Sequence, residues 1–131
     1  MKRNYQIAVT TLAAGLLMSG ALVWRLSAAE EKPGPIKEVM QTYHKAPKGT
    51  DPTCKKALDG KATAEEIKKL VAAYKVLTTA KPPKGDEASW KEKTSKLFAA
   101  AQGLEKSAPD AVAKYKEAVN CKACHTVHRP D

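Results

Sequence analysis

The sequence predicts an all-α protein folded as an antiparallel four-helix bundle. The chain has 131 residues, a length that suits one domain. Ala, Lys, Leu and Glu are abundant and cost little entropy in a helix, whereas aromatic residues make up only 5% of the chain. Four segments show helical apolar spacing, and turn-rich or proline-containing connections separate them. Four such helices in about a hundred residues favour a bundle.

Residues 1–29 have the features of an export signal. Lys2 and Arg3 form a basic start, and the nearly uncharged apolar run of residues 7–24 follows. Ser27-Ala28-Ala29 then offers small residues for cleavage before Glu30. Because the run is longer than a minimal signal core, an uncleaved membrane anchor is the alternative. Either interpretation places the domain of residues 30–131 outside the cytoplasm, in the periplasm or an equivalent location.

The charge of the exported domain favours acidic partners. Removal of residues 1–29 lowers the basic count from 23 to 20 and leaves the acidic count at 14, so the net charge is +6. This sign favours acidic proteins or anionic surfaces. Nucleic acid is a poor partner, because the lysines are spread evenly along the predicted helices and the chain is exported. The simpler interpretation is that these lysines solvate the helix faces.

The first helix is expected between two prolines. Pro35 suits a first helical turn, and the helix should end before Pro47, since the residue before a proline avoids helical geometry. A short helix is expected over residues 54–58, before the turn signal Asp59-Gly60. The apolar face of the first helix consists of Ile36, Val39, Met40 and Tyr43.

The second and third helices have clear start signals. Thr63-Ala64-Glu65-Glu66 is a capping-box pattern, and the helix that follows should end at the polar linker of residues 81–85. Asp86 can cap the third helix. The expected apolar positions are Ile67, Leu70, Val71, Tyr74 and Leu77 in the second helix, and Trp90, Leu97, Phe98, Ala101 and Leu104 in the third.

The fourth helix should begin at Ser107-Ala108-Pro109-Asp110, which supplies an N-cap, an early proline and an early acid. Its apolar stripe leads directly into Cys121, so the pattern predicts one continuous C-terminal helix. The stripe consists of Val112, Tyr115, Ala118 and Val119.

The predicted C-terminal helix contains the sequence motif that indicates a chemical function. Cys121-Lys122-Ala123-Cys124-His125 is the C-x-x-C-H pattern of covalent c-type haem attachment. Two thiols three residues apart share one helix face, where each can form a thioether with one haem vinyl group. His125 is four residues after Cys121, so its imidazole can approach the iron from the same side. The pattern therefore predicts one covalent haem c with its iron bound by His125.

Three other interpretations of these residues are weaker. A disulfide or thioredoxin-like pair usually opens a helix after a strand, whereas this pair is expected to close a helix. A zinc site formed by Cys121, Cys124, His125 and His128 would have poor geometry, because two of its ligands are adjacent in sequence. An accidental match, in a helical module without haem, is disfavoured by the predicted export and the helical context.

A helical domain with this motif near its C-terminus resembles the class II cytochromes c, the cytochrome c-prime family. Residues 121–129 resemble the terminal segment of that family, in which an aromatic residue usually replaces His128 and a basic residue stands at Arg129. Residues 36–44 resemble the family's first helix, which lines the open face of the haem. The chain between the two segments is shorter than is usual in the family.

The resemblance implies that the first helix decides function. Met40 matches the methionine that binds iron in low-spin members, and a thioether opposite His125 raises the reduction potential and suits electron transfer. Met40 as ordinary core filler is the alternative. His44, one turn further along the same face, is an alternative ligand. Without a sixth ligand the protein would bind small gases such as nitric oxide or carbon monoxide, as high-spin members do.

The remaining candidates have open roles. Arg129 is expected to pair with a haem propionate or to screen His125, and its alternative is a charged chain end. His128 is expected to contact a propionate or solvent. Cys54, the odd cysteine, is expected to be buried like a small hydrophobe, with a free thiol or an intermolecular disulfide as alternatives.

No catalytic constellation is visible in the sequence. The predicted function is therefore that of an exported one-electron carrier, not an enzyme, and its partners are redox proteins with acidic docking faces. A membrane is a partner only if residues 1–29 remain attached. The resemblance also implies a homodimer, because family members often pair through their first helices.

Overall fold

A computed structural model describes residues 33–130 of the chain. This range contains six α-helices and no strand, so the prediction of an all-α protein is confirmed. The predicted export signal of residues 1–29 lies outside the described residues. Within residues 33–130, no helix is both long enough and apolar enough to cross a membrane.

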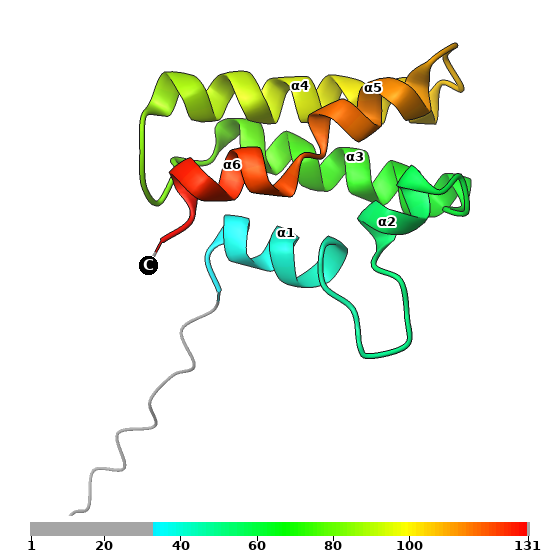
Figure 1. Ribbon diagram of the computed structural model, residues 1–131, viewed down its shortest axis with the longest axis horizontal. Coiled ribbons are helices and arrows are strands. Elements are labelled where there is room, and N and C mark those ends of the chain that lie inside the picture. Colours follow the sequence, from blue (N-terminus) through cyan, green and yellow to red (C-terminus); the bar gives the residue numbers. More distant parts are fainter. Residues whose placement is uncertain (1–32, 131) are drawn as a thin grey trace, which may run out of the picture. The chain divides into compact units, whose positions relative to one another are not determined.

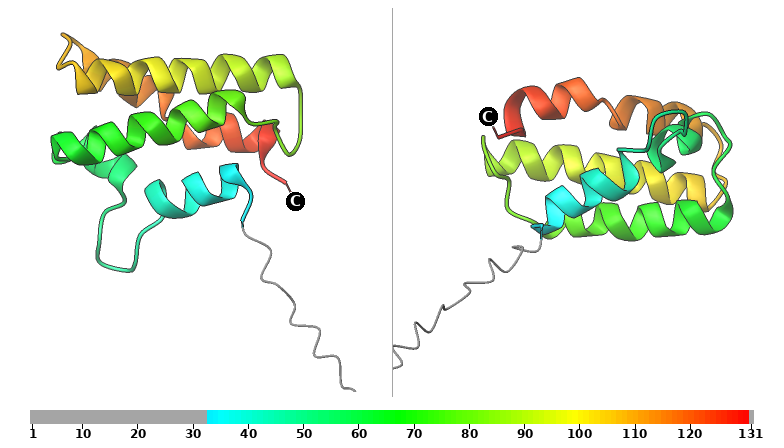
Figure 2. Two further views of the ribbon diagram at one scale, coloured as in Figure 1. Left: turned by 180° about the vertical axis from the view of Figure 1, so that it is seen from behind. Right: turned by 90° about the horizontal axis from the view of Figure 1, so that it is seen from below.

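Two long helices form the centre of the fold. α3 (Ala64–Thr79) and α4 (Glu87–Glu105) run antiparallel and make the most extensive contact between any two elements (Figure 1). α5 (Ala111–Ala118) returns along α4, and α6 (Cys121–His128) continues in the same direction. α1 (Pro35–Tyr43) packs on α3, and the short α2 (Thr53–Leu58) contacts α3 and α5. Successive long segments therefore alternate in direction, as the two further views also show (Figure 2).

The helix starts follow the capping signals of the sequence. The Thr63 hydroxyl accepts the Glu66 N–H at 3.2 Å, and the Glu66 carboxylate accepts the Thr63 N–H at 2.9 Å. This reciprocal pair confirms the capping box and satisfies two backbone donors that would otherwise lack partners. At the start of α4 the Asp86 carboxylate accepts the Ser89 N–H at 2.8 Å, which confirms the second predicted cap.

The core lies between α3, α4 and α5, and α1 covers one side of it. Its largest side chains with less than 2% of their surface exposed are Leu70, Tyr74, Leu77 and Tyr115. Trp90, also buried, donates its indole N–H to the carbonyl oxygens of Leu77 and Ala80, at 3.1 and 2.9 Å. These hydrogen bonds join the first turn of α4 to the last turn of α3, because Trp carries one donor that needs a partner when buried.

The prediction of one continuous fourth helix is wrong. α5 ends at Ala118, and α6 begins at Cys121 after two residues outside regular helix. The Asn120 side chain accepts the Ala123 N–H at 3.1 Å, and so it caps a new helix. The Cys121–Cys124 pair therefore opens a helix, whereas the sequence suggested that it closes one. The apolar stripe continues across the break, which is why its periodicity did not reveal the cap.

The start of α5 also differs from its prediction. Asp110 stands at the N-cap, and its side chain makes no capping hydrogen bond. Its backbone is left-handed, with φ of 60°, and Ser107 also has a positive φ of 50°. The chain therefore reverses tightly between α4 and α5 through two left-handed residues, which Asp tolerates better than most side chains do.

The connection between α3 and α4 approaches α6 closely at Gly85. This residue has φ of +83°, and a Cβ placed on it would lie 2.9 Å from the Val127 carbonyl oxygen and from Nδ1 of His128. Such separations are shorter than van der Waals contact. The absence of a side chain at residue 85 therefore allows the loop to lie against the helix that carries the C-x-x-C-H pattern.

Gly85→Ala should destabilise the fold more than Gly60→Ala does. Gly60 has a similar φ of +69°, but a Cβ there meets nothing within 4 Å. Gly60→Ala should cost only the left-handed backbone term of about 1–2 kcal/mol. Gly85→Ala should add a further cost of about 1–3 kcal/mol from overlap with α6. Denaturant unfolding of both variants measures the difference, and equal losses would contradict the close contact.

Candidate functional site

A cavity brings the C-terminal motif together with the first helix. Cys121, Cys124 and His125 of α6 line one side of it, and Met40 and His44 from the end of α1 line another. The space amounts to about 690 Å³, including the part that is open to solvent. Residues separated by about eighty positions in the sequence thus meet at one site. Most of the remaining lining is apolar and includes Leu77, Trp90, Leu97 and Val119.

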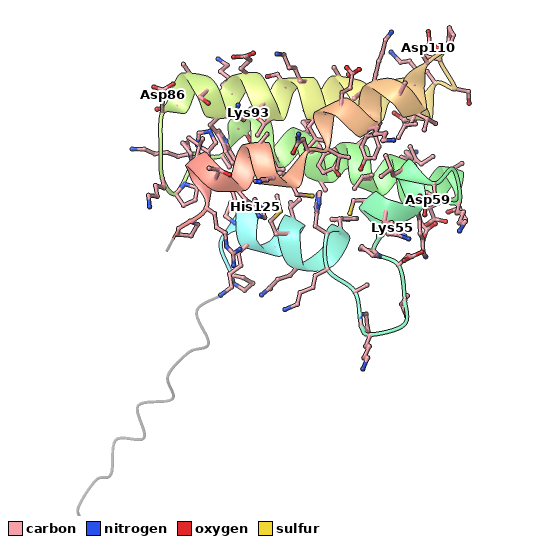
Figure 3. The ribbon with its side chains drawn as sticks, viewed as in Figure 1. Lys55, Asp59, Asp86, Lys93, Asp110 and His125 are labelled. Atoms are coloured by element: carbon pink, nitrogen blue, oxygen red, sulfur yellow. The ribbon has the colours of Figure 1, made fainter. Side chains whose placement is uncertain are left out.

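The motif residues lie at the start of α6, on the surface of the domain. Cys121 and His125 are exposed and Cys124 is half-buried, and both thiols are free. Burial raises the pKa of the Cys124 thiol, and the nearby Lys93 ammonium on α4 partly opposes this change. Cys124 is therefore protonated at neutral pH. Figure 3 shows His125 on α6 and Lys93 on the neighbouring α4.

Met40 and His44 occupy the end of α1 that reaches the cavity. Met40 is half-buried and packs against the hydrophobic core, while His44 is the residue that ends the helix. Burial, with a smaller contribution from His125, lowers the pKa of His44 to about 4. The His44 imidazole is therefore neutral at neutral pH. Both residues that the sequence offered as sixth ligands line the same cavity as His125.

Two tyrosines behind His44 form a hydrogen-bonded chain that sequence reasoning did not find. The Tyr74 hydroxyl lies 3.1 Å from Nε2 of His44 and 2.8 Å from the Tyr115 hydroxyl. Burial raises the pKa of both tyrosines above the usual value, so both phenols remain protonated. The helical spacing of the sequence predicts both residues as members of the apolar core. The residue type itself could have indicated these hydrogen bonds, because a buried tyrosine, unlike phenylalanine, needs a hydrogen-bond partner for its hydroxyl.

Cys54 reaches the same cavity from α2. It is half-buried and lines the space beside Cys121, rather than being enclosed in the core as expected. Burial raises the pKa of its thiol, and the neighbouring Cys121 raises it further. The cavity is thus lined by the thiols of all three cysteines among residues 33–130.

His128 differs most from its expected position. It is buried, with 2% of its surface exposed, so the expectation of a solvent contact is wrong. Its Nδ1 lies 2.9 Å from the Lys84 carbonyl oxygen and its Nε2 lies 3.3 Å from the Ser89 hydroxyl. Its ring meets Trp90 edge-on, with 5.3 Å between the ring centroids. The residue therefore anchors the end of α6 to the α3–α4 loop.

The zinc interpretation loses a ligand through this arrangement. Both ring nitrogens of His128 are engaged by Lys84 and Ser89, away from the cavity. Among residues 33–130, no group of three or more His, Cys, Asp or Glu side chains has the geometry to hold a metal ion. Arg129 is exposed and is not among the cavity-lining residues, although its backbone N–H donates to the His125 carbonyl oxygen at 3.3 Å.

No protein-family model, curated protein or solved structure matches this chain. The site is therefore characterised by its own residues. Two thiols and a histidine on one short helix face a largely apolar space, with a thioether and a neutral imidazole at the end of α1. This set of donors and apolar walls fits a covalently attached haem, which needs two thiols, one or two axial ligands and an apolar enclosure.

His128→Phe should retain much more stability than His128→Ala. Phenylalanine keeps the ring contact with Trp90 and loses only the two hydrogen bonds, at a cost of about 1–2 kcal/mol. Alanine also leaves a cavity at the end of α6, so its total cost should reach about 3–4 kcal/mol. Denaturant unfolding of the two variants tests this. Equal losses would show that the contact between His128 and Trp90 contributes nothing.

Proposed function

We propose that this protein is an exported class II cytochrome c that carries single electrons. In this proposal α1, α3, α4 and the broken pair α5–α6 are the four helices of the bundle, and haem c is attached to α6. Cys121 and Cys124 form the thioethers, His125 binds the iron on the proximal side, and Met40 binds it on the distal side.

The observation that carries the proposal is the convergence of the two predicted segments on one cavity. The motif on α6 is identified by its spacing, and the end of α1 by the resemblance to the class II cytochromes c. They line the same space, and the walls between them are mostly apolar. An accidental C-x-x-C-H pattern gives no reason for a methionine and a histidine of a distant helix to lie opposite it.

The chain's own residues have separate tasks at this site. A bound haem supplies an iron that alternates between Fe(III) and Fe(II). The two thiols would hold the group covalently, and His125 of α6 and Met40 of α1 would be the ligands of its iron. Leu77, Trp90 and Leu97 exclude water, and the resulting low dielectric disfavours the more highly charged oxidised state. Apolar walls and a thioether ligand therefore both raise the reduction potential.

The net positive charge of the domain supports acidic redox proteins as its partners. A domain of residues 30–131 has net charge +6, and Lys93 lies at the cavity itself. Opposite charge at a docking face accelerates encounter and orients the partner, so acidic redox proteins are the proposed partners. No nucleic acid, catalytic or enzymatic role is proposed. The periplasmic location is part of the proposal, and a membrane attachment applies only if residues 1–29 stay uncleaved. A homodimer through α1 is also proposed.

One observation favours the gas-binding alternative. Met40 packs against the hydrophobic core as well as lining the cavity. If the methionine keeps that core position when haem is attached, the sixth position stays open inside an apolar space, which suits nitric oxide or carbon monoxide. The state of the iron in the reduced protein separates the two functions.

The holoprotein should carry the mass of one haem, held by two bonds. Cys121→Ala and Cys124→Ala should each leave one thioether, and the double variant should leave none. Cys54→Ala is the matched control, because Cys54 lines the same cavity but lies outside the motif, and it should retain full attachment. Intact mass and the denatured haem spectrum measure both quantities. A wild-type protein without added mass after expression in a haem-attaching host contradicts the proposal.

Met40→Ala should abolish the methionine–iron charge-transfer band of the oxidised protein and lower the reduction potential, because it removes the thioether ligand. His44→Ala is the control from the same helix end, and it should leave the band in place. A reduced wild-type protein with five-coordinate, high-spin iron that binds carbon monoxide without displacing a ligand would instead favour the gas-binding function.

A further inference from the structure

Three side chains connect the distal side of the cavity to the centre of the domain. His44 ends α1, Tyr74 belongs to α3 and Tyr115 belongs to α5, and hydrogen bonds of 3.1 and 2.8 Å join them in that order. Tyr74 and Tyr115 have 0% of their surface exposed. Their rings are stacked, with 6.4 Å between the centroids and 26° between the planes. The Tyr74 hydroxyl is therefore held in place by the burial of its ring and by its hydrogen bond to Tyr115 of α5.

The hydrogen bonds that join His44, Tyr74 and Tyr115 engage Nε2 of the His44 ring. Nε2 is the ring nitrogen farthest from the backbone, and it points at the fixed Tyr74 hydroxyl. A histidine binds a metal through a ring nitrogen with a free lone pair, and the groups around the ring decide which nitrogen is free. Because Tyr74 cannot follow a movement of His44, turning Nε2 toward the cavity requires breaking this hydrogen bond.

Met40 has no comparable restraint. It lies one helical turn before His44 on α1, lines the same cavity and has a side chain without a hydrogen-bonding group to commit. Methionine is also unbranched and has several rotatable bonds, so it adapts its position at little cost. Both candidate ligands contact the core, but only the histidine is held there by a hydrogen bond.

We propose that Tyr74 is a positioning residue that keeps Nε2 of His44 away from the iron and leaves the sixth position to Met40. The inference rests on the proposed function, since it concerns the ligand of the same haem. Its consequence is the choice between two axial ligand sets of different reduction potential. A thioether opposite histidine gives a higher potential than a second imidazole does.

The test compares two tyrosine variants of the holoprotein. Tyr74→Phe frees His44, and so the oxidised protein should lose the methionine–iron band, remain low-spin and show a lower reduction potential. Tyr115→Phe is the matched control, because it removes an equally buried hydroxyl but leaves the bond between Tyr74 and His44. That control should lose stability and keep the methionine band.

A double variant separates a ligand exchange from general loosening of the fold. Tyr74→Phe combined with His44→Ala removes the competing imidazole, and the methionine band should return. If Tyr74→Phe retains the band and the potential of the wild type, the role of Tyr74 is overturned. If the band stays absent in the double variant, the role is also overturned, because the loss then did not depend on His44.

Wild-type measurements keep the inference testable if Tyr74→Phe does not fold. Nitrogen NMR of the reduced holoprotein should show a hydrogen-bonded, metal-free Nε2 at His44, and a free Nε2 overturns the inference. Iron bound by two histidines, with loss of one ligand in His44→Ala, overturns the role of Tyr74 and leaves electron transfer intact. Five-coordinate iron overturns this role and the proposed function together.

Discussion

Trp90 is the residue on which the arrangement of this domain depends. Its indole N–H bonds to the last turn of α3, its ring meets His128 at the end of α6, and its side chain lines the cavity. A single buried side chain thus connects the two central helices to each other and to the end of the motif helix. A large aromatic ring can do this because it combines extensive apolar contact with one directional donor.

The domain satisfies its buried polar groups by pairing elements that are distant in sequence. Within residues 33–130, every buried side-chain nitrogen or oxygen has a hydrogen-bond partner. The bond between Tyr74 and Tyr115 joins α3 to α5, and the bonds of His128 join α6 to the α3–α4 loop and to the first turn of α4. An unpaired polar group in a core is costly, so such pairs disfavour other registers of the same helices. The few polar core residues therefore specify how the helices pack, and the apolar residues supply most of the stabilisation.

Sequence reasoning succeeded where the signal is local. The Thr63–Glu66 capping box and the Asp86 cap predicted the starts of α3 and α4, because a cap needs only residues within one turn. It failed at Asn120, where an apolar stripe continued across a capped break and concealed it. It failed again at His128, whose partners lie some forty positions earlier in the chain. Neither partner is visible in a pattern of neighbouring residues.

What the sequence alone determined is the set of chemical groups, namely two thiols and a histidine at motif spacing, a methionine and a histidine on an earlier helix, and helical segments to carry them. Only the tertiary structure decided that these groups line one cavity, that Cys54 joins them, and that Tyr74 holds His44 while nothing comparable holds Met40. The physical reason is that helix spacing sets which face a side chain occupies. The packing of buried side chains from other helices sets what that face meets.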